Sequence, residues 1–300
     1  MTIRIGTSER DGTFHSQGRA LAAILEQAQV GPVEVLESKS ASVDNAKRLA
    51  AGEIDFGFMA SNWIGRAKRG EAPFGAPVDL RMAAPMNAGP LFFIALARSP
   101  IRAVSDLRGR RLAVGLGTSG MVQHVHAIFG VLGLRFSDFT PVYLDFAAGA
   151  DALAAGEVDA QFQCPIPNQM MSDLAARVEL RVLGYGPGQI ETVLRAVPDY
   201  RTTVMRKQAI RGLDADVAQL AVVNVLATHA RVPEPVVRDV VAAVIRQADE
   251  LARMNALFAG LPDLFAPLRQ QGPAALEFGN VPLHPGALRA YREAGLVECL

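Results

Sequence analysis

The residues most able to do chemistry form a glycine-rich run, Gly115-Leu116-Gly117-Thr118-Ser119-Gly120, which matches the pattern G-x-G-x-x-G. The surrounding pattern predicts a strand before this run and a helix over 121–133 after it. Loops in that context hold phosphate groups at a helix N-terminus. Asp145 ends the next predicted strand, 25 residues beyond Gly120, roughly where a ribose-binding acid would stand. The run therefore raises one hypothesis, an NAD-dependent oxidoreductase.

Three features of the chain argue against a dinucleotide. The glycine run lies in the middle of the sequence, and no Lys/His/Asp or Ser/Tyr/Lys set can be placed opposite it. A second polar loop, 6–13, lies between a predicted strand at 3–5 and a predicted helix at 14–28. Each loop leads into a helix N-terminus, where free backbone N–H groups and the helix dipole favour an anion. Two such loops favour one anionic ligand held by both.

The remaining reactive side chains form no catalytic or metal-binding set. His124 and His126 are two residues apart on a predicted helix and point to different faces, which argues against a metal pair. His15 lies at the start of the first predicted helix and is a candidate ligand contact. Cys164 follows a predicted strand without a partner base, and whether it pairs with Cys299 stays open. We expect no metal, cofactor or catalytic residue.

The elements that position the two loops occur twice. The phrase Leu-Ala-Ala-Gly-Glu-x-Asp begins at Leu49 and returns at Leu153, 104 residues later. Each copy predicts a helix end, a glycine with positive φ just after it, and then a buried strand. Both halves share the order strand, polar loop, helix, strand, helix, Ala-Gly-Glu turn and strand. The sequence therefore predicts an α/β chain of two similar lobes.

Two apolar strands, 91–97 and 222–228, are predicted to cross between the lobes. Lobe one would comprise 1–95 and 226–300, and lobe two 96–225. Residues 86–90 are predicted to form a loop. A long helix is predicted over 235–258 and a last short helix over 286–294, whereas 177–205 reads as less regular. A chain of 300 residues with 50% hydrophobic content suits two domains, because single cores rarely grow beyond roughly 250–300 residues.

Composition excludes several classes of protein. Thirty basic and thirty acidic residues give a formal net charge of zero, without the basic footprint of a nucleic-acid binder. No apolar run reaches the ~18 residues that a membrane span needs. The chain enters a strand pattern at Ile3-Arg4-Ile5, so no secretory signal is expected within it. This pattern fits a cytoplasmic protein or a mature or trimmed chain.

These stretches together resemble the solute receptors of TRAP transporters, of the TAXI subfamily, and the resemblance covers nearly the whole chain. The opening loop is similar to that family's glycine-rich opening, although Ser8, Glu9 and Asp11 stand where the family usually has glycines. The most specific match is at the C-terminus. The matching stretches are Ile5-Gly6-Thr7, Gly12-Thr13-Phe14-His15, Ser42-Val43-Asp44-Asn45, the Leu-Ala-Ala-Gly-Glu-Ile-Asp phrase, Val114-Gly115, Ser119-Gly120, Pro282-Leu283-His284-Pro285-Gly286-Ala287 and Tyr291-Arg292-Glu293-Ala294-Gly295.

The resemblance implies a type II periplasmic-binding-protein fold, with two α/β lobes joined by two crossing hinge strands. It implies a periplasmic receptor that closes on a small organic anion, commonly a carboxylate or amino acid, and delivers it to the membrane subunits of a TRAP transporter. An ABC-type receptor on the same fold is a further alternative. The predicted ligand contacts are Ser8, Arg10, Gly12, Thr13, Phe14, His15, Ser40, Ser42, Asn45, Ser61, Asn62, Asn87, Thr118, Ser119, Gly120, Tyr143 and Gln163.

Overall fold

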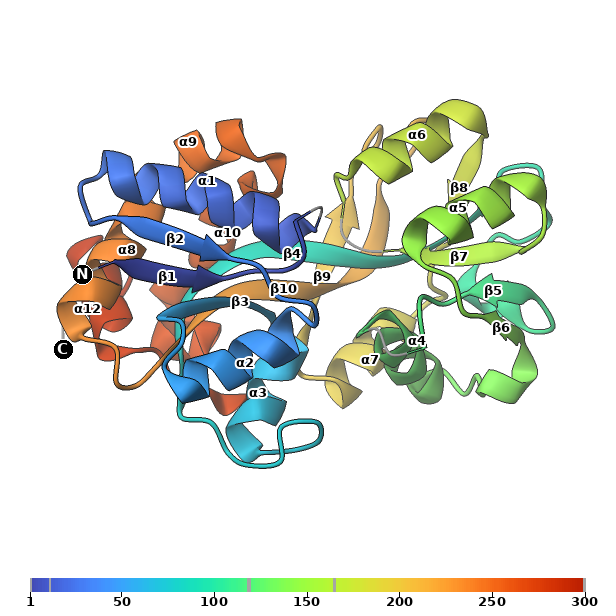
Figure 1. The fold of residues 1–300 in the computed structure, drawn as a ribbon. Coiled ribbons are helices and arrows are strands. Elements are labelled where there is room, and N and C mark those ends of the chain that lie inside the picture. The colour runs from blue at the N-terminus through green and yellow to red at the C-terminus, as the bar shows by residue number, and fades with distance from the viewer. Residues whose placement is uncertain (1, 11, 118–119, 164–165, 299–300) are drawn as a thin grey trace. The chain divides into compact units, whose positions relative to one another are not determined.

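The computed structural model describes residues 2–10, 12–117, 120–163 and 166–298. Its contacts divide the chain into two compact units, Met1–Ala88 with Val223–Leu300 (unit 1) and Gly89–Val222 (unit 2). Two long strands, β4 (Leu80–Leu96) and β10 (Val217–His229), continue through both boundaries (Figure 1). Within the described part of the chain, no helix has the length and apolar character needed to cross a membrane.

Unit 1 is an α/β unit with strand order β2-β1-β3-β10-β4. Strand β1 (Ile3–Gly6) runs parallel to β2 (Val33–Leu36) and to β3 (Phe56–Ala60), and β10 pairs antiparallel with β3. Helices flank this sheet (Figure 1). They are α1 (Thr13–Gln27), α2 (Ser42–Ala51), α3 (Ser61–Arg69), α8 (Glu234–Arg246), α9 (Ala248–Met254), α10 (Leu261–Phe265), α11 (Leu268–Gln271) and α12 (Pro285–Glu293).

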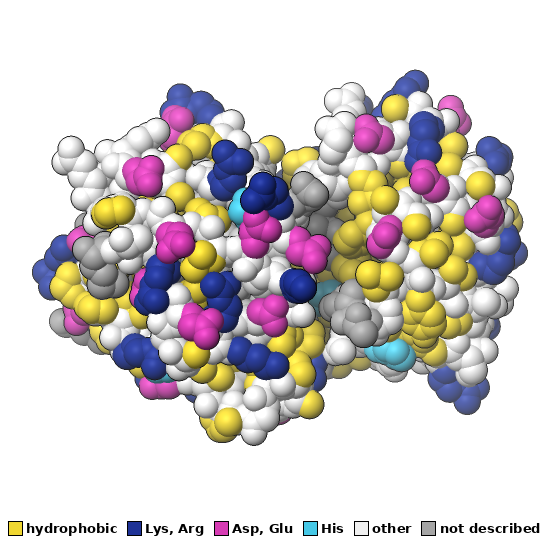
Figure 2. Space-filling view, in the orientation of Figure 1, with side chains coloured by type: hydrophobic (Ala, Val, Ile, Leu, Met, Phe, Trp, Pro, Cys, Tyr) yellow, Lys and Arg dark blue, Asp and Glu magenta, His cyan; other side chains and the backbone are white. Residues whose placement is uncertain are grey.

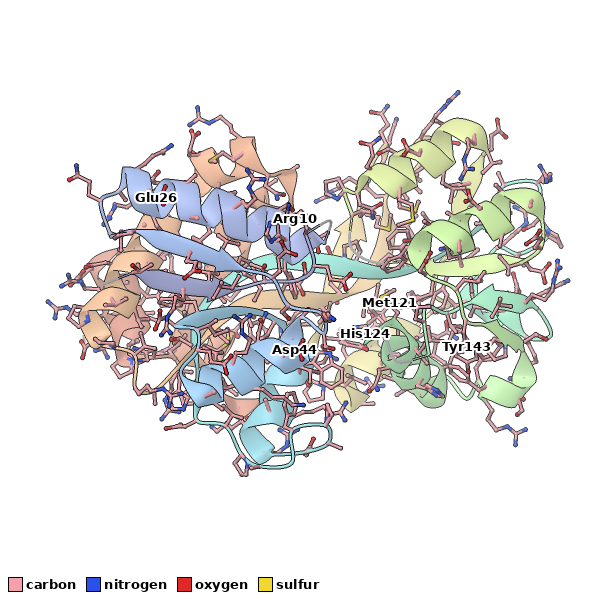
Figure 3. The ribbon with its side chains drawn as sticks, in the orientation of Figure 1. Arg10, Glu26, Asp44, Met121, His124 and Tyr143 are labelled. Atoms are coloured by element: carbon pink, nitrogen blue, oxygen red, sulfur yellow. The ribbon has the colours of Figure 1, made fainter. Side chains whose placement is uncertain are left out.

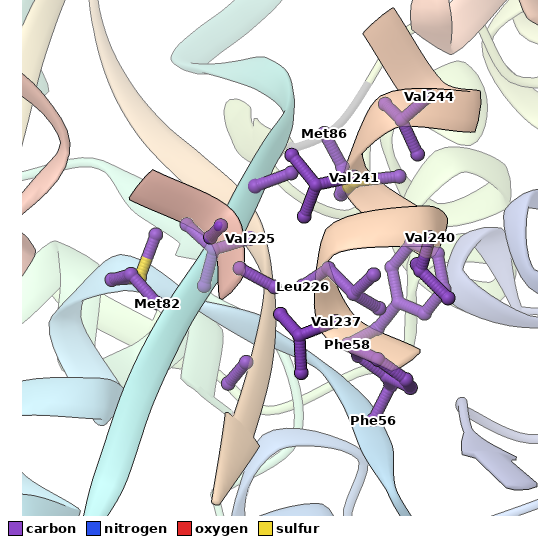
Figure 4. Packing of buried hydrophobic residues seen from close by; sticks show 14 of the residues in the cluster. Phe56, Phe58, Met82, Met86, Val225, Leu226, Val237, Val240, Val241 and Val244 are labelled. Carbon is purple, nitrogen blue, oxygen red and sulfur yellow. The ribbon is translucent and has the colours of Figure 1, made fainter. Parts of the chain in front are cut away.

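The core of unit 1 follows from helical and strand periodicity. On α8 the buried residues are spaced i, i+3, i+4 and i+7, which places them on one face. This face lies among Phe56 and Phe58 of β3 and Leu226 of β10 (Figure 4). Burying one such side chain fully contributes about 1.5–3 kcal/mol. The four helical residues are Val237, Val240, Val241 and Val244, all fully buried.

Unit 2 repeats the parallel arrangement. Strand β5 (Arg111–Ala113) runs parallel to β6 (Thr140–Val142) and to β7 (Ala160–Gln163), and β7 pairs antiparallel with β4. Phe93 packs against Phe129 and Phe162, with ring centroids 5.3 and 4.8 Å away. The other elements are α4 (Gly120–Val131), α5 (Phe146–Ala155), α6 (Gln169–Arg177), β8 (Leu180–Val182), α7 (Gln189–Ala196) and β9 (Tyr200–Met205).

The repeated Ala-Gly-Glu phrase has the same structure in both units. Gly52 and Gly156 end α2 and α5 in the left-handed conformation, with φ of 75° and 77°, as the sequence predicts. The aspartate that follows each turn then holds the arginine of the first parallel strand. We refer to Arg4–Asp55 in unit 1 and Arg111–Asp159 in unit 2 as the two Arg–Asp latches.

The two latches match bond for bond. Asp55 accepts hydrogen bonds from the backbone N–H of Arg4 at 2.9 Å and from its Nε and Nη2 at 3.2 and 2.9 Å. Asp159 accepts the same three bonds from Arg111, at 2.7, 3.2 and 2.8 Å. The Arg111 guanidinium holds the pKa of the Asp159 carboxyl below its usual range. Each latch therefore fixes the helix-to-strand step against the first strand of its own unit.

Several predicted elements differ from the structure. Residues 86–90 are part of β4 rather than a loop, because the strand pairs with β10 on one side of them and with β7 and β8 on the other. The helix predicted over 235–258 breaks at Gln247, whose φ of −111° and ψ of 25° are not helical. The less regular stretch, 177–205, contains β8, α7 and all of β9.

Candidate functional site

Three parallel strands of unit 1 end at one edge of the sheet, and a polar segment follows each. Strand β1 ends at Gly6, β2 at Leu36 and β3 at Ala60. Ligands of open α/β sheets bind at the carboxyl ends of the strands. Several predicted ligand contacts lie in these segments: Ser8, Arg10 and Gly12 after β1, Ser40 after β2, and Ser61 and Asn62 at the start of α3 after β3.

The first two segments are tied to each other. The backbone N–H of Ser38 donates to the carbonyl of Ser8 at 3.3 Å, and the Arg10 guanidinium pairs with Glu37 at 3.0 Å. The Arg10 side chain is 80% exposed and Glu37 is 44% exposed. An exposed pair contributes only about 0–1 kcal/mol. Arg10 can therefore exchange Glu37 for the carboxylate of a solute at little cost.

The N-terminus of α1 carries a positive dipole end without a compensating acid. Gly12 occupies the cap position in an extended conformation, without a side-chain cap, and the first turn contains no acidic residue. The Ser8 hydroxyl accepts from the backbone N–H of His15 at 3.2 Å, and His15 Nδ1 lies 3.3 Å from the Thr7 hydroxyl. Phe14 packs on Phe58, with centroids 5.6 Å apart. These contacts fix the start of the helix. Thr13, in the first turn, is a further polar residue and is half-buried.

Two predicted ligand contacts have hydrogen bonds inside the protein. Asn45 is fully buried, and its Nδ2 donates to the carbonyls of Thr7 at 2.8 Å and Phe58 at 2.9 Å. The Ser42 hydroxyl accepts from the backbone N–H of Ala60 at 3.0 Å. Ser42 is the first residue of α2, and Ala41 precedes the helix. Both side chains thus hold the three segments in register.

A buried amide cluster lies where α1 covers β4 and β10. Asn87 Oδ1 accepts from Gln17 Nε2 at 3.1 Å and from Asn224 Nδ2 at 3.2 Å, and the three residues are at most 6% exposed. Gln17 Oε1 and Asn87 Nδ2 have no partner among the described residues. A buried unpaired polar group costs about 1–3 kcal/mol. Of these three residues, only Asn87 was predicted from the sequence. Gln17, a polar residue on the apolar face of α1, was a sequence signal of this cluster that the prediction missed.

The corresponding edge of unit 2 contains the glycine-rich loop. This loop follows β5 and precedes α4, as predicted, and Gly115 has a φ of 93°. Gly120 begins α4, whereas Thr118 and Ser119 lie outside the described residues, as do Cys164 and Cys299. Tyr143 is half exposed, and Gln163 at the end of β7 is fully buried. Asp145 caps α5 by accepting from the backbone N–H of Ala148 at 2.8 Å.

The chain matches a model of the NMT1-like family over residues 5–295. It belongs to the NMT1-like family. The fold is shared with the TctC solute-binding protein from Polaromonas, at 15% identity and a TM-score of 0.56 over 87% of this chain and 94% of that one. It is also shared with the periplasmic sulfonate-binding protein SsuA of a putative ABC transporter from Methylobacillus flagellatus KT, at 16% identity and a TM-score of 0.51 over 99% and 88%.

A third structure, titled as a periplasmic transporter, aligns at 14% identity with a TM-score of 0.57, over 92% of this chain and 95% of that one. These likenesses confirm the predicted type II periplasmic-binding-protein fold. At these identities they show the fold alone, and the coarser functional prediction of a solute-binding protein stays a prediction. The finer prediction, the TAXI subfamily of the TRAP transporters, is not what the family match names.

In this NMT1-like protein the C-terminal signature is a packing motif. His284 Nδ1 accepts from the backbone N–H of Gly286 at 3.1 Å and caps α12, and burial lowers the pKa of the His284 imidazole. A Cβ at Gly286 would lie 2.3 Å from the Glu234 carbonyl, so only glycine lets α12 pack this closely on α8. The Tyr291 hydroxyl donates to the Ala83 carbonyl at 2.9 Å. The signature therefore builds unit 1 and carries no information about the solute.

The two helical histidines of the NMT1-like chain have separate partners, as their spacing predicts. His124 is buried on α4, with Nδ1 2.6 Å from the Tyr200 hydroxyl, and burial lowers its pKa to about 4. His126 stacks on Phe136, with centroids 3.5 Å apart. Figure 3 shows His124 and Met121 on α4. His124 is therefore neutral at pH 7. Among the described residues, no three or more His, Cys, Asp or Glu form a cluster that could hold a metal.

Proposed function

We propose that this NMT1-like protein is a periplasmic solute receptor, without a catalytic role, that binds a small organic anion such as a carboxylate or amino acid. One observation carries the proposal. Gly12 at the cap position of α1 supplies no side-chain cap, Ser8 accepts only the N–H of His15, and the first turn contains no acid. This helix start lies at the edge where three polar segments meet. Backbone N–H groups in that setting bind anions without a full positive charge.

Arg10 supports an anionic solute because its exposed pairing with Glu37 is easily exchanged. A solute carboxylate can take the place of the Glu37 carboxylate and form a charge-assisted bond. We further propose that Gly120 at the start of α4, together with Thr118 and Ser119, contacts the same solute, with Tyr143 and Gln163 nearby. Binding better to the closed than to the open form would shift the population towards closure.

The proposal that the receptor serves a TRAP transporter of the TAXI type rests on the sequence resemblance. Its rival is an ABC-type receptor, and the SsuA structure, titled as part of a putative sulfonate ABC transporter, supports this rival because it has the same fold. Co-purification of the solute-loaded protein with candidate membrane subunits tests this point. Capture of TRAP-type subunits would support the proposal, and capture of an ABC-type permease instead would refute it.

The oxidoreductase hypothesis loses its ribose-binding acid, because the Asp145 carboxylate already caps α5. Thermal unfolding with and without NAD(P) tests it directly. A ligand at about 100 times its dissociation constant adds about 2.7 kcal/mol, which raises the midpoint by several degrees. We expect no shift with NAD(P), and a clear shift would reinstate the dinucleotide hypothesis.

The anion site is tested with a matched pair of variants, Thr13→Asp and Thr13→Asn. The aspartate places a negative charge in the first turn of α1, whereas the asparagine has nearly the same shape and no charge. We expect Thr13→Asp to weaken carboxylate binding at least tenfold in calorimetric titrations, while the unliganded protein becomes more stable by about 0.3–1 kcal/mol. Thr13→Asn should bind within a few-fold of wild type. Equal carboxylate affinities for the two variants would show that the N-terminus of α1 is not part of the binding site.

A further inference from the structure

The edge of unit 2 that follows β5 and β6 differs from the polar edge of unit 1 in being apolar. The described residues contain four large hydrophobic side chains that are exposed: Leu116 and Tyr143 at 50%, Val204 at 40% and Met254 at 43%. The first two belong to neighbouring segments, because a Cβ at Gly117 would lie 3.7 Å from Tyr143 Cδ1. Exposed apolar side chains that gather at one place commonly mark binding sites.

Charges at this edge are few and acidic. From 115 to 117 and from 143 to 148, the described residues include one charged side chain, Asp145, whose carboxylate caps α5. His124, on the second turn of α4, is buried and bonded to Tyr200. Among these described residues, an anionic group would therefore meet one carboxylate and no cationic side chain. Figure 2 shows hydrophobic side chains gathered over the part of unit 2 that includes α5.

Gln163 provides a second and independent sign of a ligand. It is fully buried, and neither its amide nitrogen nor its amide oxygen has a partner among the described residues. Strand β7 is registered against β5 by Leu112↔Ala160 and Ala113↔Gln161. Gln163 is the last residue of β7 and Ala113 the last residue of β5, so both strands end at the edge that contains the segment 115–117. An orphaned buried amide costs about 1–3 kcal/mol, which a hydrogen bond from a ligand or water would recover.

From these observations we infer that the edge of unit 2 holds an apolar subsite, in which Leu116 and Tyr143 contact an alkyl or aromatic body of the solute. This inference rests on the proposed function. It narrows the proposed organic anion to amphipathic anions, whose body is apolar. The side-chain amide of Gln163 then forms a hydrogen bond with a single polar group on the apolar body of the solute. Small polar amino acids such as aspartate are excluded as the best solutes.

The test is a ligand-observed NMR titration with acetate, butanoate, hexanoate and aspartate. Each buried methylene should tighten binding about fourfold, so hexanoate should bind roughly 15-fold tighter than butanoate. The double variant Leu116→Ser with Tyr143→Ser should lose this gradient, so that hexanoate binds no more than about twofold tighter than butanoate. The control is Val204→Ser with Met254→Ser, which removes the other two exposed hydrophobic side chains and should keep the gradient. Far-UV circular dichroism confirms that both variants fold.

The outcomes separate the two proposals. A gradient in wild type and in the control, lost in the Leu116/Tyr143 variant, supports the subsite. A gradient that survives in that variant, or aspartate binding tighter than hexanoate, overturns the subsite and leaves the anion receptor standing. If neither aspartate nor any of the monocarboxylates binds the wild-type protein, the proposed function and the subsite both fail.

Discussion

The two Arg–Asp latches differ in burial and should therefore differ in energy. In unit 1 the side chain of Asp55 is 9% exposed and that of Arg4 36%, whereas in unit 2 Asp159 is 28% exposed and Arg111 46%. The perturbation is Asp→Ala at each aspartate. Each change removes the same three hydrogen bonds and leaves the arginine without its carboxylate.

The expected cost follows from how well water can replace the lost carboxylate. Breaking a fully buried ion pair costs about 3–5 kcal/mol, whereas an exposed pair contributes about 0–1 kcal/mol. Arg4 is about one-third exposed and regains part of its hydration, so we expect Asp55→Ala to lower the free energy of unfolding by about 2–3 kcal/mol. We expect about 1 kcal/mol for Asp159→Ala, because both members of that latch are already partly hydrated.

Urea unfolding is a suitable assay because the chain has a single tryptophan, Trp63, on α3 of unit 1. Its fluorescence reports unit 1, and far-UV circular dichroism reports both units. The control is Glu37→Ala, which removes an equally short but exposed ion pair and should change stability by at most about 0.5 kcal/mol. A cost for Asp159→Ala that equals or exceeds that for Asp55→Ala would refute the argument from burial.

Three further predictions use the same unfolding assay. Because the pKa of buried His124 is lowered to about 4, the unfolded chain binds a proton that the folded chain does not, so stability falls as the pH drops from 6.5 towards 4. Between pH 7 and 5 wild type should lose about 2 kcal/mol more than His124→Gln, and equal losses would contradict this. Asn45→Ala should cost about 2–3 kcal/mol because it removes two buried hydrogen bonds, to the Thr7 and Phe58 carbonyls. A change below about 0.5 kcal/mol would count against its bridging role. Gly286→Val should lower the free energy of unfolding by about 1–3 kcal/mol because α12 must move away from α8. An unchanged unfolding midpoint would show that the two helices can separate without loss of stability.

Sequence reasoning succeeded where one local rule decides the structure. The left-handed glycines, Gly52 and Gly156, and the glycine-rich loop between β5 and α4 were all readable from short patterns. It failed where a distant partner decides. Gly89 and Pro90 read as a turn, yet pairing of β4 with strands from elsewhere in the chain keeps the segment extended.

The candidate site shows the same division between local and distant causes. The loops after the strands were predicted, whereas Gln17 and Asn224 join Asn87 only through contacts between segments far apart in the sequence. The two latches were not predicted from the sequence. Arg4 and Arg111 are 107 residues apart, so the arginines do not follow the 104-residue spacing of the repeated phrase. The roles of the predicted ligand contacts stay a prediction until a solute is measured.

The latches also bear on how such a protein could be rebuilt. Each latch closes within its own unit, and unit 2 is one uninterrupted stretch of chain, 89–222, that both begins and ends within a strand. A chimera that exchanges this stretch for that of another family member needs only two junctions, one in β4 and one in β10. Neither junction separates an arginine from its aspartate. Any solute specificity that depends on residues of unit 2 is thus transferred by exchanging one continuous gene segment.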